Sequence, residues 1–277
     1  SNNSDNPDET PRTISLTVND GTANSNVEQV SVDVVAIDNP AILSLISANA
    51  TYTEGDAPVS VLSSASITDD GVNICGLSAE IMLASDTDEL LAVINNNPEI
   101  TVSYDLGNYV LTVSGTVAIS EYTTILESLS YENTSSNPNI ESRDISIFVN
   151  DCTSNSVAQM VRVDVVAADN SPVLNLDVNG IDDPNFATNY VEGSPQIIVG
   201  SVAITDADST HLSSLSAEIE NPLTEDVLSV DVGTSNLVAS YNSGILTVSG
   251  YATLADYELV LATLSYNNTS DNPDTTD

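Results

Sequence analysis

Apolar and polar residues alternate along many segments of the chain. Ile14, Leu16 and Val18 are separated by small polar residues, and the segment 145–149 has the same pattern. Alternation of β-branched apolar residues with polar ones is typical of strands that bury one face. It predicts strands near residues 13–18, 30–34, 59–67, 77–83, 100–104, 109–117, 145–149, 161–165, 196–204, 215–219, 227–231, 236–241 and 245–250.

One segment in each half of the chain departs from this alternation. In the segment 254–263 and just beyond it, Leu254, Tyr257, Leu261 and Leu264 are spaced by three or four residues. That spacing places side chains on one face of a helix. We therefore expect a short helix here, crossing between two strands, and a second one in the related segment 119–129.

The chain also repeats itself, with a period close to the size of one domain. Residues 110–139 return at 245–274, and residues 11–39 return at 142–170. A fixed period indicates an array in which each unit is one structural module. We expect residues 1–39 to be the C-terminal strands of a preceding or partner-completed repeat. Residues 40–170 then form a complete repeat, and residues 171–277 form a repeat that lacks its last strands.

The strands expected at 11–39 have two explanations, which the sequence leaves open. If the chain is a whole subunit, they complete the open sandwich of a neighbouring chain, head to tail, and build a filament by strand addition. If it is an excerpt of a longer repeat protein, they complete the preceding repeat of the same polypeptide.

The charge balance excludes several classes of function. The chain has 41 acidic residues against three arginines and no lysine, a formal charge of −38. Binding to nucleic acid or to an anionic membrane surface is excluded in practice. Such self-repulsion opposes a compact fold, so either divalent cations neutralise it or the surface is adapted to salty water. Arg12 and Arg143 occupy the same place in their repeats, which suggests a structural ion pair.

Acidic residues recur at strand ends in four motifs. They are Asp38-Asn39 with Asp169-Asn170, Glu54-Gly55 with Glu192-Gly193, Asp69-Asp70 with Asp206-Ala207-Asp208, and Asn19-Asp20 with Asn150-Asp151. Calcium takes about six to eight oxygen ligands from carboxylates, carbonyls and amides. These motifs supply that number only if they converge where two sandwiches meet. The alternative is that they are ordinary turn residues, since Asp and Asn favour turns.

In their order and recurrence, these motifs resemble those of tandem cadherin-like domains. The resemblance implies an all-β fold of tandem antiparallel Greek-key β-sandwiches, extracellular, with Ca²⁺ bound between domains. Carried over residue by residue, it implies ligands at the second junction from Glu54, Asp169, Asn170, Asp206 and Asp208. At the first junction it implies Asp38, Asn39, Asp69 and Asp151, and the remaining copies of the motifs add Asp20 and Glu192. The run Asp69-Asp70-Gly71 departs from the family's Asp-x-Asp pattern.

Two cysteines and several sequons carry covalent predictions. Cys75 and Cys152 both lie in the central repeat, where the position matching Cys152 in the other copy is Gly21. Two cysteines in one repeat favour a disulfide over two separate thiols. Glycosylation is predicted at three Asn-x-Ser/Thr sites, Asn49, Asn133 and Asn268.

The leading hypothesis for function is a non-enzymatic, extracellular structural or adhesive repeat protein. Calcium at the junctions would turn a string of sandwiches into an end-to-end rod or filament, with copies of itself or neighbouring repeats as partners. The alternative is a carbohydrate- or protein-binding adhesion module of a larger surface protein. Catalysis is disfavoured because the sequence offers no set of nucleophile, base and orienting group.

Overall fold

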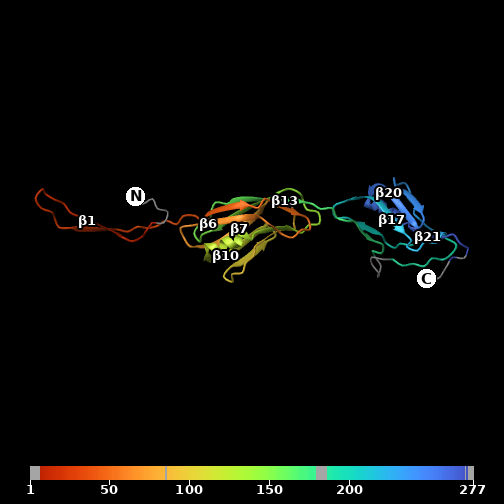
Figure 1. The fold of residues 1–277 in the computed structure, drawn as a ribbon, viewed down its shortest axis with the longest axis horizontal. Helices are drawn as coiled ribbons and strands as arrows, with labels where there is room; N and C mark the ends of the chain where they lie inside the picture. The colour runs from red at the N-terminus through yellow and green to blue at the C-terminus, as the bar shows by residue number, and fades with distance from the viewer. Residues whose placement is uncertain (1–6, 85, 179–185, 272, 274–277) are drawn as a thin grey trace. The chain divides into compact units, whose positions relative to one another are not determined.

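The computed structural model describes residues 7–84, 86–178, 186–271 and 273 (Figure 1). Two compact units divide between Ala168 and Asp169. Each unit is described by itself below. Among the described residues, no helix is long and apolar enough to cross a membrane.

The first unit begins with a hairpin of two strands, β1 (Arg12–Leu16) and β2 (Glu28–Val32), drawn in red in Figure 1. The two strands pair antiparallel, with Ile14 opposite Val30. Among the described strands, they pair with no other. Every residue of both strands is exposed, including the apolar ones.

The rest of the first unit is a β-sandwich. Its strands are β3 (Ile42–Ser47), β4 (Ala50–Thr53), β5 (Val59–Ser60), β6 (Leu62–Thr68), β7 (Asn73–Met82), β8 (Glu89–Ala92), β9 (Thr101–Asp105), β10 (Val110–Ala118), β11 (Ser130–Asn133), β12 (Arg143–Asn150) and β13 (Gln159–Val166). One sheet has the order β4-β13-β12-β7-β10-β9, a second has the order β5-β11-β8, and β3 pairs with β6. Val113 and Ile145 of the first sheet and Leu91 and Tyr131 of the second belong to one buried core.

The second unit contains related strands in smaller sheets. They are β14 (Val173–Asn175), β15 (Gln196–Ile197), β16 (Ala203–Thr205), β17 (His211–Glu218), β18 (Asp226–Ser229), β19 (Val238–Asn242), β20 (Ile245–Thr253) and β21 (Ser265–Asn268). The described strands form sheets of order β17-β20-β19, β15-β21-β18 and β14-β16. Val248 and Tyr257 are fully buried in its separate core.

A short helix follows the long strand of each unit, as predicted. These helices are α1 (Ile119–Glu127) and α2 (Leu254–Leu261). Tyr122 and Tyr257 are fully buried, and their hydroxyls donate to the carbonyl oxygens of Gly115 and Gly250 at 2.8 and 2.7 Å. Gly115 has a φ of +143°, and a Cβ there would lie 2.4 Å from a backbone oxygen, so glycine is required.

The all-β sandwich fold is confirmed, with two corrections to the expected strands. The segments 59–67 and 196–204 are each two strands and not one: β5 and β6 in the first, and β15 and β16 in the second. The pair β4–β13 is parallel, with Val163 opposite Ala50. Among the described pairs it is the single exception to the antiparallel arrangement, and it arises because the second strand of the repeat runs beside its last strand.

Candidate metal centre

The residues predicted for the first junction lie near one another in the first unit. Asp38 and Asn39 precede β3, Asp69 and Asp70 follow β6, and Asp151 follows β12. The backbone N–H and the side-chain amide of Asn39 donate to Oδ2 of Asp70 at 3.3 and 3.1 Å. The backbone N–H of Ala41 donates to Oδ2 of Asp151 at 3.2 Å. Both acidic turns therefore hold the segment that leads into β3.

Asp151 is a buried carboxylate with several donors. Its Oδ1 accepts from the backbone N–H groups of Thr153 and Ser154, at 2.8 and 2.7 Å, and only 7% of the residue is exposed. Burial alone would raise its pKa, but these hydrogen bonds and those from the Ser154 hydroxyl and Ala41 keep the pKa lowered. Asp151 is therefore ionised at neutral pH.

Asp69 is the unsatisfied member of this group. Its Oδ1 is buried and has no hydrogen-bond partner among the described residues, while Oδ2 accepts from the N–H of Gly71 at 3.1 Å. The pKa of Asp69 is raised, first by desolvation and then by the negative charges of Asp70, Asp151 and Asp38. A bound cation would remove both causes, because it supplies a partner for Oδ1 and a charge opposite to the surrounding carboxylates.

The donor atoms here fit a hard cation such as calcium, since all of them are carboxylate or amide oxygens. Among the described residues, however, no three acidic side chains are arranged to hold a metal ion as they stand. Binding would require side chains to turn, for example Asp70 away from Asn39. Asp20, predicted with this set, accepts from the N–H groups of Thr22 and Ala23 in the exposed hairpin turn.

The residues predicted for the second junction are divided between the two units. In the first unit, Oε2 of Glu54 accepts from the N–H of Ala168 at 3.1 Å. In the second unit, Oδ2 of Asp208 accepts from the N–H of Asn170 at 3.0 Å. The predicted ligands thus hold the linker backbone on each side of the unit boundary. Asp169 and Glu192 are exposed.

Asp206 belongs to the same predicted site. Desolvation acts to raise its pKa, but hydrogen bonds with the Asp208 side chain and with the N–H groups of Ser209 and Asp208 keep the pKa lowered. Its Oδ1 accepts from the N–H groups of Asp208 and Ser209 at 3.2 and 3.0 Å. A calcium site formed jointly by Glu54, Asp206 and Asp208 stays a prediction.

The sequence predicts an ion pair for Arg143 without naming its partners. Arg143 is 1% exposed, Nε contacts Oε1 of the fully buried Glu89, and Nη2 lies 2.9 Å from Oδ2 of Asp86. Burial alone would lower the pKa of Arg143, but contact with Glu89 keeps it raised, so the guanidinium stays charged. Glu89 is the first residue of the apolar strand β8, and Asp226 is the first residue of β18. An acidic residue at the start of an apolar strand is the sequence signal that could have identified the partner of Arg143.

The two cysteines and the sequons occupy distinct places in the structure. Cys75 of β7 and Cys152, in the turn after β12, form a disulfide with their Cα atoms 5.0 Å apart. Asn133 and Asn268 are 1% and 7% exposed. Their amides donate to Asp86 and Asp226 at 2.8 Å.

Burial counts against two of the three glycosylation predictions, which stay predictions. The amides of Asn133 and Asn268 are buried and hydrogen-bonded, which gives both residues a packing role in the folded chain. Asn49 lies exposed between β3 and β4, and its glycosylation stays a prediction.

Solved structures similar to this chain include cadherin ectodomains, in agreement with the resemblance found in the sequence. One is the protocadherin GammaB4 extracellular domain, at 14% identity and a TM-score of 0.25, covering 87% of this chain and 33% of that one. Another is the human desmocollin-1 ectodomain, at 10% identity and a TM-score of 0.26, covering 83% of this chain and 37% of that one. The chain thus spans about a third of their length.

A structure titled BspA_C_WT matches at 7% identity and a TM-score of 0.23, covering 70% of this chain and 72% of that one. With TM-scores of this size, none of these structures carries an argument about function. No protein-family model matches the chain, and no curated protein matches it.

Proposed function

We propose that this chain is an extracellular structural or adhesive repeat protein whose sandwiches join end to end into a rod or filament, with calcium bound at the junctions. The observation that carries the proposal is Asp69. A half-buried carboxylate with one oxygen lacking a described partner, and with three acidic neighbours that raise its pKa, is a group that a cation stabilises. Its oxygen-only surroundings favour calcium over softer metals.

At the first junction the ion would be held by Asp38, Asn39, Asp69 and Asp151, and Asp70 would join them if its carboxylate turned away from Asn39. At the second, the proposed ligands are Glu54, Asp169, Asn170, Asp206 and Asp208. A bound ion supplies positive charge and ties the linker to the strand ends on both sides. It would therefore oppose the self-repulsion of a chain with a formal charge of −38 and reduce bending at the junctions.

Isothermal titration of calcium into the metal-free chain tests the first site. Asp69→Asn removes the charge that the ion would neutralise, so we expect calcium affinity to fall about tenfold or more, the scale of one lost charged ligand. Asp105→Asn is the matched control, because Asp105 is the exposed last residue of β9 in the same sandwich and the change in charge is identical. Equal binding by both variants would contradict the assignment of Asp69.

Small-angle scattering and limited proteolysis test the mechanical consequence. Removal of calcium with a chelator should broaden the distribution of lengths in solution and speed cleavage in the linkers at residues 36–39 and 167–171. Sodium chloride added to the chelated protein at matched ionic strength separates this proposal from a salt-adapted surface. If sodium restores the stiff state as well as calcium does, bound calcium is not the cause.

The alternative function, an adhesion module that binds carbohydrate or protein, has one observation in its favour. The second unit has a cavity lined mainly by aliphatic side chains. Such a lining suits a polypeptide with apolar side chains better than a sugar.

A further inference from the structure

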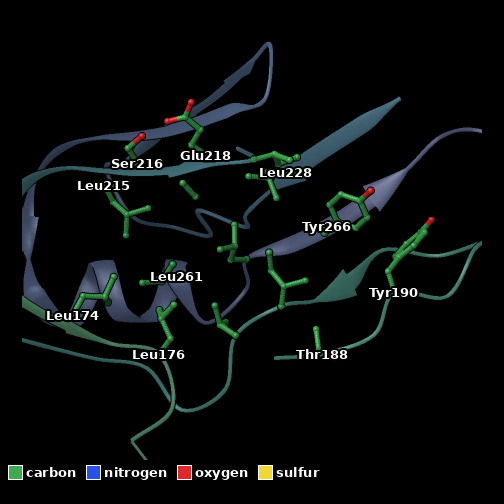
Figure 2. Close-up of a pocket in the computed structure, with 15 residues that line it drawn as sticks. Leu174, Leu176, Thr188, Tyr190, Leu215, Ser216, Glu218, Leu228, Leu261 and Tyr266 are labelled. Carbon is green, nitrogen blue, oxygen red and sulfur yellow. The ribbon is translucent and has the colours of Figure 1, made fainter. Parts of the chain in front are cut away.

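The second unit has an open apolar groove of about 490 Å³. Its lining includes Leu174, Leu176, Tyr190, Leu215, Leu228 and Tyr266, whose side chains gather between β17, β21 and helix α2 in Figure 2. Within the described part of the chain, β17 pairs with β20 on one side and with no strand on the other. An unpaired strand beside an apolar groove is a site where another strand can add.

The same positions are covered in the first unit. Leu77, Ala79 and Ile81 of β7 are 2%, 0% and 2% exposed, and the buried side chains of the neighbouring β12 lie beside them on the same face of the sheet. Their counterparts in β17 and just after it, Leu215, Ala217 and Ile219, are only partly buried. Among its described residues, the second unit therefore has the core of a sandwich without the strand pair that extends the sheet beyond β7 in the first.

The position of Tyr190 also shows that the second unit lacks a strand that the first unit has, among the described residues. Tyr190 matches Tyr52, because each ring packs edge-on against a tyrosine of the neighbouring sheet and each hydroxyl donates to the carbonyl oxygen of an equivalent asparagine. Tyr52 lies in β4, which is a strand through its pairing with β13. The described residues around Tyr190 form no strand. The partner that would order them is the equivalent of β13.

The hairpin β1–β2 has the structure of that missing pair. Its register places Arg12 opposite Val32, as β12–β13 places Arg143 opposite Val163. The turns also match: the amide of Asn19 donates to Asn24 at 2.6 Å, and the amide of Asn150 donates to Asn155 at 2.7 Å.

The two pairs differ in burial. Ile14 and Leu16 are 48% and 53% exposed, whereas their counterparts Ile145 and Ile147 are fully buried. An isolated two-stranded hairpin is marginally stable in water, so a pair with this apolar face requires a partner.

The arginine completes the correspondence. Nη1 and Nη2 of Arg12 donate to the carbonyl oxygens of Thr10 and Asp8, and those of Arg143 donate to the residues two and four places before it in the same way. The remaining contacts of Arg143 go to Glu89 and Asp86. Arg12 instead lies 45% exposed, with a 3.7 Å contact to Asp8.

Asp226 occupies the position of Glu89 in the second unit. The hydroxyls of Tyr104 and Tyr241 donate to the carbonyl oxygens of Glu89 and Asp226, which fixes the equivalence. Asp226 is 6% exposed, and its carboxylate accepts from the amide of Asn268 and the hydroxyl of Tyr266. No positively charged side chain contacts it among the described residues, so this buried carboxylate, which accepts from the groove-lining Tyr266, has no cationic partner there.

We propose that the β1–β2 hairpin of one copy of this chain docks into the groove of the second unit of another copy and places Arg12 beside Asp226. By analogy with β12 on β7, Ile14 would lie opposite Ile219, Leu16 opposite Ala217 and Val18 opposite Leu215. The inference rests on the proposed end-to-end array and names the contact that joins its members. Charge complementarity fixes the direction, because the arginine lies on the hairpin and the carboxylate lies next to Tyr266, which lines the groove.

A designed disulfide between two chains tests this seating. In the first unit the bridge joins Cys75 of β7 to Cys152 in the turn. The corresponding positions are Ser213 of β17 and Gly21 of the hairpin turn, where the φ of +97° is close to the +89° of Cys152. A full-length Gly21→Cys chain mixed with a full-length Ser213→Cys chain should form a covalent heterodimer, read by intact mass under non-reducing conditions.

The control replaces Ser213→Cys with Ser240→Cys, also an exposed serine, on β19 of the same sheet. A heterodimer with Ser213→Cys alone supports the proposal. No heterodimer, or equal yields with both variants, overturns it. In the double variant Gly21→Cys/Ser213→Cys, a bridge within one chain at all concentrations would also overturn it, because the hairpin would then occupy its own groove.

Sedimentation velocity across a concentration series gives an independent measurement. Arg12→Gln should weaken self-association by on the order of tenfold or more, since it leaves the buried Asp226 without a positively charged partner in the complex. Arg162→Gln is the control, because Arg162 pairs with Asp144 on an exposed surface. Equal association by both variants, or a chain that stays monomeric throughout, contradicts the docking. Calcium titration remains a separate readout, so loss of docking with intact calcium binding refutes only this inference.

Discussion

The same strand pair occurs twice in the described chain, once inside a sandwich as β12–β13 and once alone as β1–β2. Register, turn hydrogen bonds and the local contacts of the arginine are the same in both places. Burial is not: Val149 is fully buried, and its counterpart Val18 is 74% exposed. The comparison shows that about thirty residues of local sequence determine the pair itself, whereas its stability depends on the surface that it meets.

The acidic residues at the two equivalent positions, Glu89 in the first unit and Asp226 in the second, also differ in their partners. Glu89 is fully buried and contacts Arg143, whereas Asp226 is almost as buried and is held by neutral donors. Desolvation acts to raise the pKa of Asp226, but hydrogen bonds from Tyr266, the N–H of Leu223 and Asn268 keep it lowered. Neutral donors are therefore sufficient to keep a carboxylate charged at a site where the first unit has an arginine.

Replacing the arginine should give the largest difference in the free energy of unfolding between the buried pair β12–β13 and the exposed pair β1–β2. Arg143→Ala should lower the free energy of unfolding of the first unit by about 3–5 kcal/mol, because it leaves Glu89 buried without its partner. Arg12→Ala in dilute solution should change it by less than about 0.5 kcal/mol, the usual effect at an exposed site. Urea unfolding followed by hydrogen exchange within each unit measures both. Similar losses for the two variants would show that the hairpin is already buried in the monomer.

The disulfide distinguishes the two pairs next. Replacement of both Cys75 and Cys152 by serine should lower the stability of the first unit by roughly 4–5 kcal/mol, the value that chain entropy gives for opening a loop of 77 residues. The second unit should be unchanged, because it contains no cysteine. Thermal unfolding, with and without reductant on the unaltered chain, provides the check. Equal shifts in both units would mean that they unfold as one body.

Truncation of one leucine in each unit compares covered and uncovered strands. Leu77→Ala should destabilise the first unit by about 2–5 kcal/mol, the range for a fully buried leucine. Leu215→Ala should reduce the stability of the second unit by roughly 1 kcal/mol, because its side chain is only partly buried. Urea titration at low protein concentration measures both values. A full-sized loss at Leu215 would mean that the groove is already filled.

The smallest expected effect is the pH dependence of Asp69 in the calcium-free chain. Because its folded-state pKa is raised above the ordinary 3.8, the folded protein holds more protons than the unfolded chain between these two values. Stability therefore falls as the pH rises through that window. Asp69→Asn should remove this loss and raise the melting temperature at neutral pH, measured with chelator present.

The contribution of Asp226 to stability depends on pH in the opposite direction to that of Asp69. Its folded-state pKa is lowered, so its contribution is present above the ordinary aspartate pKa and is lost as the pH falls through the lowered value. The second unit should therefore lose stability at acidic pH while the Asp69 contribution recovers in the first. If Asp69→Asn leaves the melting temperature of the first unit unchanged, Asp69 is not destabilised by its surroundings. That result would contradict the observation on which the calcium proposal depends.

Much of the fold followed from local patterns. The alternation at 145–149 and 161–165 predicted β12 and β13, and the spacing of Tyr257 and Leu261 predicted α2, because these periodicities reflect one buried face. Strands β3, β4, β8, β11, β14 and β21 escaped prediction. Five of them have three or four residues, too few for a period, and each is a strand because of the partner beside it. The sixth, β3, has six residues, but its apolar residues do not alternate strictly with polar ones.

The candidate site was only partly readable for a related reason. Acidic motifs at strand ends identified Asp38, Asp69 and Asp151, since turns are where carboxylates are tolerated. Asp86 and Asp226 were missed, because their role depends on an arginine distant in sequence or in another chain. The sequons at Asn133 and Asn268 gave no sign of their packing role, since a sequence motif does not report that the amide is buried and donates to a carboxylate.

The bridge between Cys75 and Cys152 has a consequence for assembly. A free hairpin that resembles β12–β13 could displace that pair from the first sandwich by domain swapping, and such an exchange would join the copies in the wrong order. The covalent link fastens the resident turn to β7, and the free hairpin has Gly21 where the thiol would be required. Only the second sandwich, which has no cysteine, then remains open to an arriving hairpin.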